Sequence, residues 1–162
     1  MTAEGASGGV VRAAEPRDLD RVAAMWTSIT QHHEPLDPLF RMRPDADGEL
    51  RELLRALMRD RDVGVFVFER EGDIGGICIV RIDHAPPILL ETERAEITDL
   101  GVRPDLRRRG IGRLLLGEAL AWVKMSGVKR VEVQVASANA EGQRFWRSQG
   151  FGDLMDVLHK RL

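Results

Sequence analysis

Residues 106–116 read Leu-Arg-Arg-Arg-Gly-Ile-Gly-Arg-Leu-Leu-Leu, and they join a predicted strand to a predicted helix. The strand is expected at 95–102, because this run has the length and β-branched content of a strand and Arg103-Pro104-Asp105 ends it. The helix is expected from Gly110 to about Met125, where apolar residues recur at helical spacing. A glycine-rich loop before a helix N-terminus presents unpaired N–H groups, so the stretch predicts an anion site, with phosphate as the natural ligand.

Two familiar nucleotide-binding motifs do not fit this loop. A P-loop needs Lys and then Ser or Thr after its second glycine, whereas Gly112 is followed by Arg113 and Leu114. A dinucleotide-binding fingerprint needs a third glycine where Leu115 stands. The phosphate ligand therefore has to be of another kind.

The loop resembles the acyl-CoA pyrophosphate loop of the Gcn5-related N-acetyltransferase (GNAT) superfamily. That loop has the pattern Gln/Arg-x-x-Gly-x-Gly/Ala, matched here by Arg107-x-x-Gly110-x-Gly112. A second block is similar to the family's closing strand and helix: a strand-like run at 131–135, then Asn139-Ala140, then Phe-Trp-Arg-Ser-Gln-Gly-Phe at 145–151. The order and the spacing of both blocks agree with the family.

Composition places the chain among single-domain proteins without an obvious polyanionic partner. Its 162 residues fit one domain, and its net charge of −2 offers no electrostatic case for nucleic acid or an anionic membrane. No apolar run reaches the roughly 20 residues that span a bilayer, and residues 1–9 lack the features of a signal peptide. The single cysteine, Cys78, lies in an apolar run and is expected to be a buried thiol, which favours a cytoplasmic protein.

The order of predicted elements indicates an α/β (α+β) fold in one domain at 10–162, preceded by a flexible tail at 1–9. The expected sheet is mixed and mostly antiparallel, with helices on both faces, because the helical crossover after Gly110 joins parallel neighbours. The family resemblance adds that this central parallel pair splays apart. The predicted elements are strands at 10–13, 63–69, 74–82, 95–102 and 130–135, helices at 16–30, 46–61, 110–125 and 139–149, an ordered loop at 31–45, a bulge at Gly75-Gly76, and a last strand or hairpin at 151–162.

The resemblance implies acetyl-CoA as co-substrate, and the sequence contains no metal-ligand spacing, so no metal is expected. By this resemblance, the loop binds the pyrophosphate of acetyl-CoA. The neighbouring Gly-x-Gly favours arginines that pair with phosphate over a solvated run of arginines. By the same resemblance, the pantetheine arm binds along the backbone edge of the preceding strand. Gly101 in this strand suits a bulge that frees one N–H. Asn139 corresponds to a pantetheine contact of the family and is equally suited to cap a helix. The expected cofactor-binding residues are Leu100, Gly101, Val102, Arg107, Arg108, Arg109, Gly110, Ile111, Gly112, Arg113 and Asn139.

Two carboxylates are candidates for the general base that takes a proton from the amine. Glu96 occupies the position that carries this base in the histone-modifying members the sequence resembles, and Asp99 is the second candidate. An odd number of residues separates them, so in a regular strand they face opposite sides and one of them reaches the cleft. His32 and His33, in the expected loop, are read either as bases of the substrate loop or as bystanders.

Trp146 is where the chain departs from the family pattern. The family commonly places there a tyrosine that protonates the departing thiolate, and this chain contains no tyrosine. An indole N–H donates a hydrogen bond but does not give up its proton. Three alternatives follow: another donor such as Ser137 or water replaces the tyrosine, the thiolate leaves unassisted, or the protein is a poor catalyst. For the indole ring of Trp146 itself we favour a packing role.

These observations predict an N-acetyltransferase that moves an acetyl group from acetyl-CoA to a primary amine of a small molecule, peptide or protein by direct attack in a ternary complex. The alternative is an acyl-CoA-binding regulatory module that is catalytically weak or inactive. The expected partner is the amine substrate, with neither nucleic acid nor membrane, and a homodimer is left open. The identity of the amine lies beyond the sequence.

Overall fold

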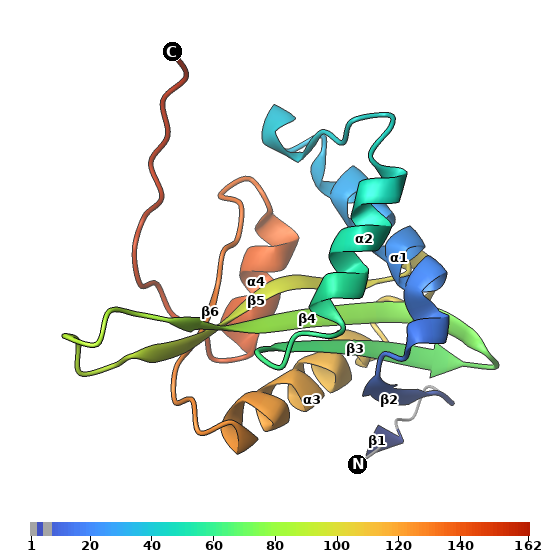
Figure 1. Cartoon of the computed structure of the whole chain (residues 1–162). Coiled ribbons are helices and arrows are strands. Elements are labelled where there is room, and N and C mark those ends of the chain that lie inside the picture. The colour runs from blue at the N-terminus through green and yellow to red at the C-terminus, as the bar shows by residue number, and fades with distance from the viewer. Residues whose placement is uncertain (1–2, 5–7) are drawn as a thin grey trace.

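The computed structural model describes residues 3–4 and 8–162, and its centre is one twisted sheet (Figure 1). In this part of the chain the sheet has six strands in the spatial order β1-β2-β3-β4-β5-β6. All neighbours are antiparallel except β5 and β6, which are parallel and are joined by the crossover through helix α3. The mixed, mostly antiparallel sheet predicted from the order of elements is confirmed.

The elements agree closely with the predicted ranges over most of the chain. The strands are β1 (Ala3–Glu4), β2 (Val10–Ala13), β3 (Val63–Arg70), β4 (Asp73–His84), β5 (Glu93–Val102) and β6 (Val131–Val133). The α-helices are α1 (Leu19–His33), α2 (Asp47–Leu57), α3 (Ile111–Met125) and α4 (Ala140–Ser148). Short 3-10 turns are η1 (Pro16–Asp18), η2 (Pro38–Phe40) and η3 (Pro104–Leu106).

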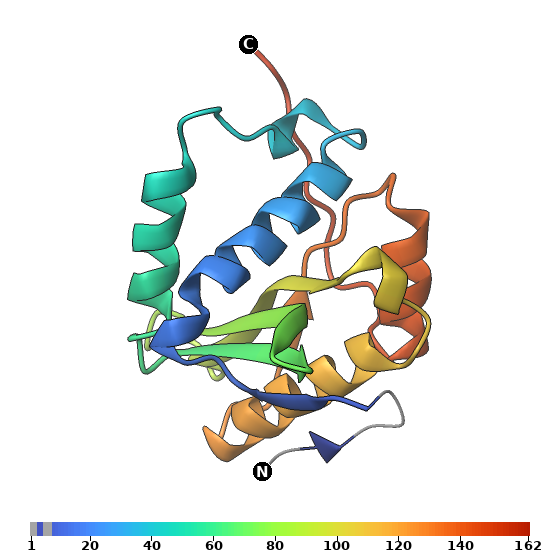
Figure 2. The same cartoon turned by 90° about the vertical axis from the view of Figure 1, so that its right-hand side faces the viewer.

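Helices cover both faces of the sheet and divide the core in two (Figures 1 and 2). On one face α3 packs with Phe66, Phe68, Cys78 and Val80 of the central strands. On the other face α1 and α2 pack on the alternate residues of the same strands, which include Val65, Val67, Ile77 and Ile79. This period-2 division is why β3 and β4 read as continuous apolar runs rather than alternating ones. Burial raises the pKa of the Cys78 thiol, as expected for a structural cysteine.

Two β-bulges interrupt the ladders. Phe68 pairs with Gly76 and Glu69 pairs with Ile74, so Gly75 is the extra residue, as predicted. Gly75 also makes room for the η3 loop, because a Cβ at this position would lie 2.3 Å from Leu106 Cδ1. In β5 the bulge is at Thr98 and not at Gly101, since Val80 pairs with Ile97 and Ile79 pairs with Asp99.

Four predicted boundaries differ from the structure. Helix α2 ends at Leu57, four residues before the predicted end at 61. Helix α1 continues through His33 instead of ending near Thr30, which removes both histidines from the expected loop. Strand β6 ends at Val133, two residues earlier than expected. The last strand or hairpin predicted at 151–162 is absent from the described chain: these residues are extended and lack strand partners, as the red trace in Figure 1 shows. An isolated strand gains no ladder hydrogen bonds, so an apolar pattern alone does not make one.

The predicted flexible tail at 1–9 lies partly outside the described residues, which omit 1–2 and 5–7. Within it, Ala3–Glu4 pairs antiparallel with β2.

Candidate functional site

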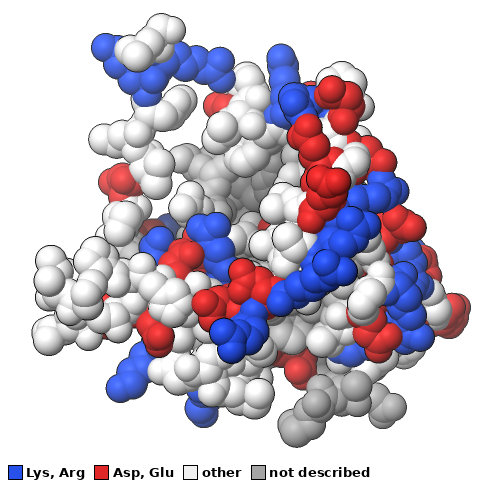
Figure 3. All heavy atoms as spheres, in the orientation of Figure 1, with Lys and Arg blue, Asp and Glu red and all other residues white. Residues whose placement is uncertain are grey.

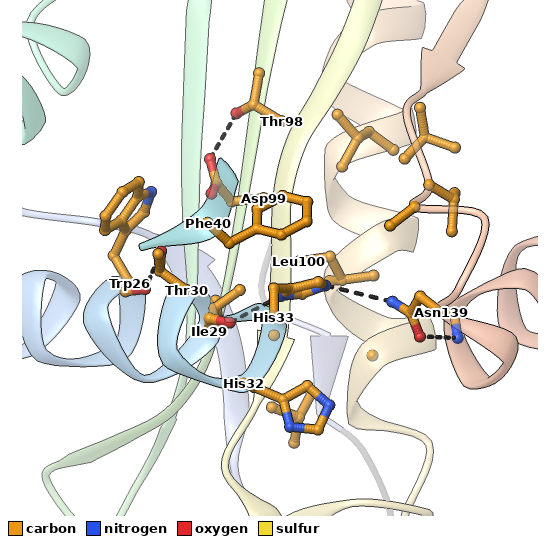
Figure 4. A pocket seen from close by; sticks show the side chains of 18 of the residues that line it. Trp26, Ile29, Thr30, His32, His33, Phe40, Thr98, Asp99, Leu100 and Asn139 are labelled. Atoms are coloured by element: carbon orange, nitrogen blue, oxygen red, sulfur yellow. Dashed lines mark hydrogen bonds between the residues drawn. The ribbon is translucent and has the colours of Figure 1, made fainter. Parts of the chain in front are cut away.

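The candidate site is a cavity of about 1210 Å³ that opens where β5 and β6 part. Its lining comes from the C-terminal ends of α1 and β5, the η2 loop, α2, the start of α3, the chain after β6, and α4. Figure 4 shows these elements converging, with side chains from α1 and β5 facing Asn139 at the start of α4. Segments far apart in the sequence therefore build one site.

The parting of β5 and β6 leaves part of the β5 backbone without a strand partner. β6 pairs with residues 95–97 of β5 and no further within the described chain. Arg103 N–H donates to Gly75 O of β4 at 2.8 Å, so by the alternation of an antiparallel ladder the polar groups of Leu100 and Val102 point the other way, into the cavity. Arg107 Nε donates to Val102 O at 3.0 Å, as this direction requires. The free N–H groups can bind a ligand as a strand would.

The loop before α3 is held in a conformation that exposes backbone N–H groups. Arg108 has a φ of 61° and Gly110 a φ of 80°, both in the left-handed region, and Gly110 is the N-cap of α3. The first N–H groups of α3 have no partner within the helix, and Ile111 and Gly112 line the cavity. The α3 N-terminus is therefore directed at the cavity, as the sequence predicts.

The loop also brings cationic groups to this helix start. Arg107, Arg108 and Arg113 line the cavity, whereas Arg109 does not. Arg103, just before the loop, pairs with both Asp73 and Asp105, but no ion pair of the three lining arginines occurs among the residues that the structure describes. Free guanidinium groups beside unpaired N–H groups suit a phosphate or pyrophosphate.

Gly112 leaves space for such a ligand. A Cβ at Gly112 would meet only ring atoms of Phe145 at 3.6 Å and Val102 Cγ2 at 3.9 Å, which are ordinary contacts. The protein itself therefore does not require glycine here, and the φ of Gly112 is not in the left-handed region. The missing side chain keeps this part of the cavity open beside the helix N-terminus. The residues present fit a pyrophosphate-bearing ligand.

Asp99 is the candidate base that reaches the cavity. Its carboxylate accepts a hydrogen bond of 2.8 Å from Thr98 Oγ1, and its side chain faces α1 beside Trp26 (Figure 4). Burial raises the pKa of Asp99, and hydrogen bonds from Thr98 and Trp26 oppose this rise only in part. A carboxylate with a raised pKa is a better proton acceptor near neutral pH than an ordinary one.

Glu96, the other candidate, does not line the cavity. It is 7% exposed, and both of its oxygens are engaged: Arg81 Nη2 donates to Oε2 at 2.7 Å and Gln134 Nε2 donates to Oε1 at 3.2 Å. Because side chains of the protein engage both oxygens, neither oxygen of Glu96 is free for a substrate amine. Its geometry is that of a buried link between β4, β5 and the chain after β6.

The expectation that the two carboxylates face opposite sides is wrong, and the bulge at Thr98 is the reason. Glu96 pairs with Arg81 and Asp99 pairs with Ile79, two positions apart in β4 and hence on the same face. The extra residue shifts the alternation by one, so both carboxylates lie on the face covered by α1 and α2. Position along β5, and not the face of the sheet, decides which one reaches the cavity.

His33 and Asn139 connect α1 to α4 across the cavity. His33 Nδ1 lies 2.8 Å from Ile29 O and donates to it, which leaves Nε2 as an acceptor for Asn139 Nδ2 at 3.3 Å. Asn139 Oδ1 in turn accepts from Gly142 N at 2.9 Å and so caps α4 (Figure 4). The capping role considered for Asn139 is confirmed. Its bond to His33 was not predicted, because the sequence placed His33 in a loop.

His32 faces the same cavity closer to the arginine loop. Burial lowers the pKa of His32, and the positive charge of Arg107 lowers it further, while Glu141 opposes both effects. A neutral imidazole at this position adds no positive charge to the loop at neutral pH. The sequence pointed to His32 only by its residue type.

Trp146 is both a lining residue and part of the core. Its side chain is 9% exposed, and its ring contacts Phe145 and Phe151 edge-on, each with a centroid distance of 5.1 Å. This geometry agrees with the packing role favoured above. Ser137, considered as a substitute proton donor, is not among the cavity-lining residues.

Among the described residues, no helix combines the length and the apolar character needed to cross a membrane. The same residues contain no group of three or more His, Cys, Asp or Glu arranged to hold a metal ion.

Comparison with known proteins gives consistent matches over nearly the whole chain. A sequence model described as the acetyltransferase (GNAT) family matches residues 26–151. The chain is 27% identical over 161 residues to the aminoglycoside N(6′)-acetyltransferase type 1 of Stenotrophomonas maltophilia, which covers 97% of this chain and 95% of that protein. It is 30% identical over 140 residues to an uncharacterized N-acetyltransferase of Archaeoglobus fulgidus, which covers 86% and 90% of the two chains.

The fold is also similar to solved structures. One is the aminoglycoside N-acetyltransferase AAC(6′)-Iy in complex with the bisubstrate analogue CoA-S-monomethyl-acetylneamine, with a TM-score of 0.75 and 16% identity, covering 94% of this chain and 96% of that one. At this identity the likeness concerns the fold. It places the cavity described above in a scaffold that is shared over the whole domain.

Proposed function

We propose that this chain, which belongs to the acetyltransferase (GNAT) family and is an acetyltransferase, transfers an acetyl group from acetyl-CoA to a primary amine of a small molecule or peptide by direct attack in a ternary complex. One observation carries the proposal. A free backbone edge at Leu100 and Val102, an exposed helix N-terminus at Gly110–Gly112 and a half-buried carboxylate at Asp99 open into the same cavity.

The loop and the start of α3 hold the pyrophosphate. Backbone N–H groups of Ile111 and Gly112 donate to its oxygens, and the guanidinium groups of Arg107, Arg108 and Arg113 neutralise its charge. The related aminoglycoside N-acetyltransferase of known structure is described with a CoA-containing ligand, which supports acetyl-CoA here. Arg109, outside the cavity lining, serves the loop only through its general positive potential.

The β5 edge orients the acyl group. Acetyl-CoA supplies the acetyl group as a thioester, which is activated toward amines. N–H groups at Leu100 and Val102 bind the extended arm as an added strand, and one of them polarises the acyl carbonyl. Gly101 allows this arrangement by its size, because a Cβ at this position would lie 2.2 Å from Ile29 Cγ1. The absence of a side chain lets α1 pack directly on the strand that carries the N–H groups.

Asp99 prepares the amine. An amine arrives mostly as an ammonium ion, and Asp99 accepts a proton from it directly or through water, leaving a nucleophilic nitrogen. In the overall reaction the N–C bond forms and the C–S bond breaks. The nitrogen loses a proton when it attacks, and the leaving thiolate of CoA takes up a proton to become a thiol. The chain has no tyrosine to deliver this proton, so a solvent water in the open cavity carries it.

Free-thiol release tests the proposal. The chain with acetyl-CoA should release CoA thiol only when an acceptor amine is present, and Asp99→Asn should reduce the rate about 100-fold or more, the usual contribution of a general base. Calorimetric titration with CoA should meanwhile give the same affinity for both proteins. An Asp99→Asn protein as fast as the wild type would remove Asp99 from the mechanism.

A second candidate is a regulatory module that binds acyl-CoA without turnover. The absence of tyrosine favours it, because Trp146 fills the corresponding position and is packed between Phe145 and Phe151. Such a module would bind CoA as tightly as the enzyme and release no thiol with any amine in a broad panel.

A further inference from the structure

The wall of the cavity built by α1, the η2 loop and α2 is predominantly apolar. The Asp99 side chain faces this wall beside Trp26 and Phe40 (Figure 4), which makes it the side proposed for the acceptor. Trp26 and Phe40 are prominent in Figure 4, where the Phe40 ring lies against His33 with a centroid distance of 5.5 Å. The apolar lining residues of this wall are Trp26, Ile29, Leu39, Phe40, Met42, Leu50 and Leu53.

Two leucines of this wall are largely in contact with water. Leu39 is 79% exposed and Leu53 is 51% exposed, yet both line the cavity together with the buried Leu50. Single exposed leucines are common on protein surfaces, but apolar side chains that continue from a buried core into a cavity mark a surface that a ligand covers. The apolar part of the acceptor would displace water from Leu39 and Leu53.

Charges on the same wall are almost fully neutralised. Arg43 is hydrogen-bonded to Glu49, and Arg41 lies 3.8 Å from Glu34. Figure 3 shows charged side chains of both signs interspersed along the α2 side of the hollow. Among the lining residues that the structure describes, the carboxylates are Glu49, Asp99 and Glu141. Glu141 belongs to α4, where its charge raises the pKa of His32. Asp99 of β5, which faces the acceptor wall, is therefore the one carboxylate beside this wall that is not paired with arginine.

A polycationic acceptor finds few partners here. An aminoglycoside carries several ammonium groups, and each one that is desolvated needs a carboxylate or an equivalent acceptor. This wall offers one free carboxylate and a continuous apolar surface. A single amine directed at Asp99, attached to an apolar body lying on Phe40, Leu39 and Leu53, satisfies both features.

We propose that the acceptor is a primary monoamine with an apolar body, of the arylalkylamine class, and not a polycationic aminoglycoside. The inference rests on the proposed acetyl transfer and specifies its substrate. The reaction is unchanged: the amine nitrogen gains the acetyl carbon, the thioester C–S bond breaks, and the proton passes to the thiol and to solvent.

The test compares three acceptors with the full-length chain and acetyl-CoA. They are 2-phenylethylamine as the apolar monoamine, ethanolamine as a polar monoamine, and kanamycin as a polycation. We expect kcat/KM for 2-phenylethylamine to exceed both others by at least about tenfold, as burial of an aromatic body predicts. Equal or higher kcat/KM for kanamycin or ethanolamine overturns the proposal.

Variants at exposed positions of the wall give a second test of the acceptor class, because replacing an exposed side chain has little effect on folding. Leu39→Gln and Leu53→Gln replace exposed apolar surface by a polar amide, so each should lower kcat/KM for 2-phenylethylamine about five- to tenfold and leave that for ethanolamine unchanged. Leu89→Gln is the matched control, because Leu89 is 53% exposed and lies outside the cavity. Unaltered selectivity in both cavity variants overturns the proposal.

Failure of the enzyme proposal is distinguishable from failure of the acceptor class. Absence of thiol release with all three amines overturns the proposed transfer. The acceptor class is then decided by calorimetry on the CoA-loaded chain, where 2-phenylethylamine should bind at least about tenfold more tightly than kanamycin. Tighter binding of kanamycin overturns the acceptor class.

Discussion

Replacing Gly112 by alanine separates the two demands that act on the start of α3, the stability of the helix and the space for a ligand. The added methyl group meets Phe145 and Val102 at ordinary contact distances, so the fold accepts it. The same methyl group projects beside the helix N-terminus, where the cavity lining includes Ile111 and Arg113. Stability and CoA affinity should therefore change in opposite directions.

The two changes have different expected sizes. Alanine is favoured over glycine in a helix by up to about 1 kcal/mol, which raises Tm by about 2–4 °C in a chain of this length. If the methyl group holds the pyrophosphate away from one N–H donor, the lost charge-assisted hydrogen bond costs about 1.5–3 kcal/mol. At 1.4 kcal/mol per factor of ten, the Kd for CoA should increase about 10- to 150-fold.

Calorimetric titration with CoA and thermal unfolding without ligand measure both quantities. Gly117→Ala is the matched control: Gly117 is in the same helix, a Cβ there would have no neighbour within 4 Å, and it does not line the cavity. It should raise Tm and leave the Kd for CoA unchanged. Gly110→Ala is a poorer test, because its φ of 80° strains any alanine. A Gly112→Ala protein with wild-type CoA affinity would refute the placement of the pyrophosphate.

Three further predictions concern the candidate base and the tryptophan. Burial holds the pKa of Asp99 above its unfolded value of about 3.9, so ionised Asp99 destabilises the fold progressively as pH rises from the unfolded pKa to the folded pKa. Thermal unfolding at several pH values should show Asp99→Asn more stable than wild type at pH 7, with no such gain below about pH 3.9. Equal Tm values at pH 7 would contradict this. Glu96→Gln should behave in the reverse way, losing about 1–3 kcal/mol of stability because Arg81 loses one of its two carboxylate partners, while the folded protein keeps kcat within a few fold. A kcat loss as large as that of Asp99→Asn would make Glu96 the base. Trp146→Phe should lower the free energy of unfolding in denaturant by about 1–3 kcal/mol through lost packing on Phe145 and Phe151, and should leave kcat within about twofold. A tenfold lower kcat in the folded variant would instead assign the indole N–H a role at the sulfur.

Local signals predicted the loop and its helix well. Helix α3 begins at Gly110, its N-cap, as the sequence predicts, and Asn139 caps α4 as its place in the sequence suggests. Each of these features depends on a few neighbouring residues whose preferences are strong and act together. The loop and helix start that we propose to bind the pyrophosphate were therefore predictable from the sequence.

Features that depend on partners distant in the sequence were not predictable in the same way. Nothing between Thr30 and His33 is a strong stop signal, so α1 continues until the chain approaches Pro35, and His33 thereby reaches Asn139. The segment 151–162 has an apolar pattern typical of a strand, but a strand also needs an edge to pair with, and β6 has three residues. Register with β4 determines the bulge in β5, and no residue type in β5 alone reports it.

The bulge at Thr98 explains why the candidate base and the free backbone donors occur side by side. Without the extra residue, the ladder with β4 would continue in phase from Ile97, and the N–H groups directed away from β4 would be those of Asp99 and Gly101. Asp99 would then pair opposite Cys78, on the face covered by α3, and its carboxylate would be buried in the apolar core. The single inserted residue turns the Asp99 side chain toward α1 and at the same time turns Leu100 and Val102 N–H toward the gap beside β6. One irregularity in β5 thus produces both requirements of the proposed chemistry, a proton acceptor on the amine side and hydrogen-bond donors for the acyl group, and removing the bulge would displace both.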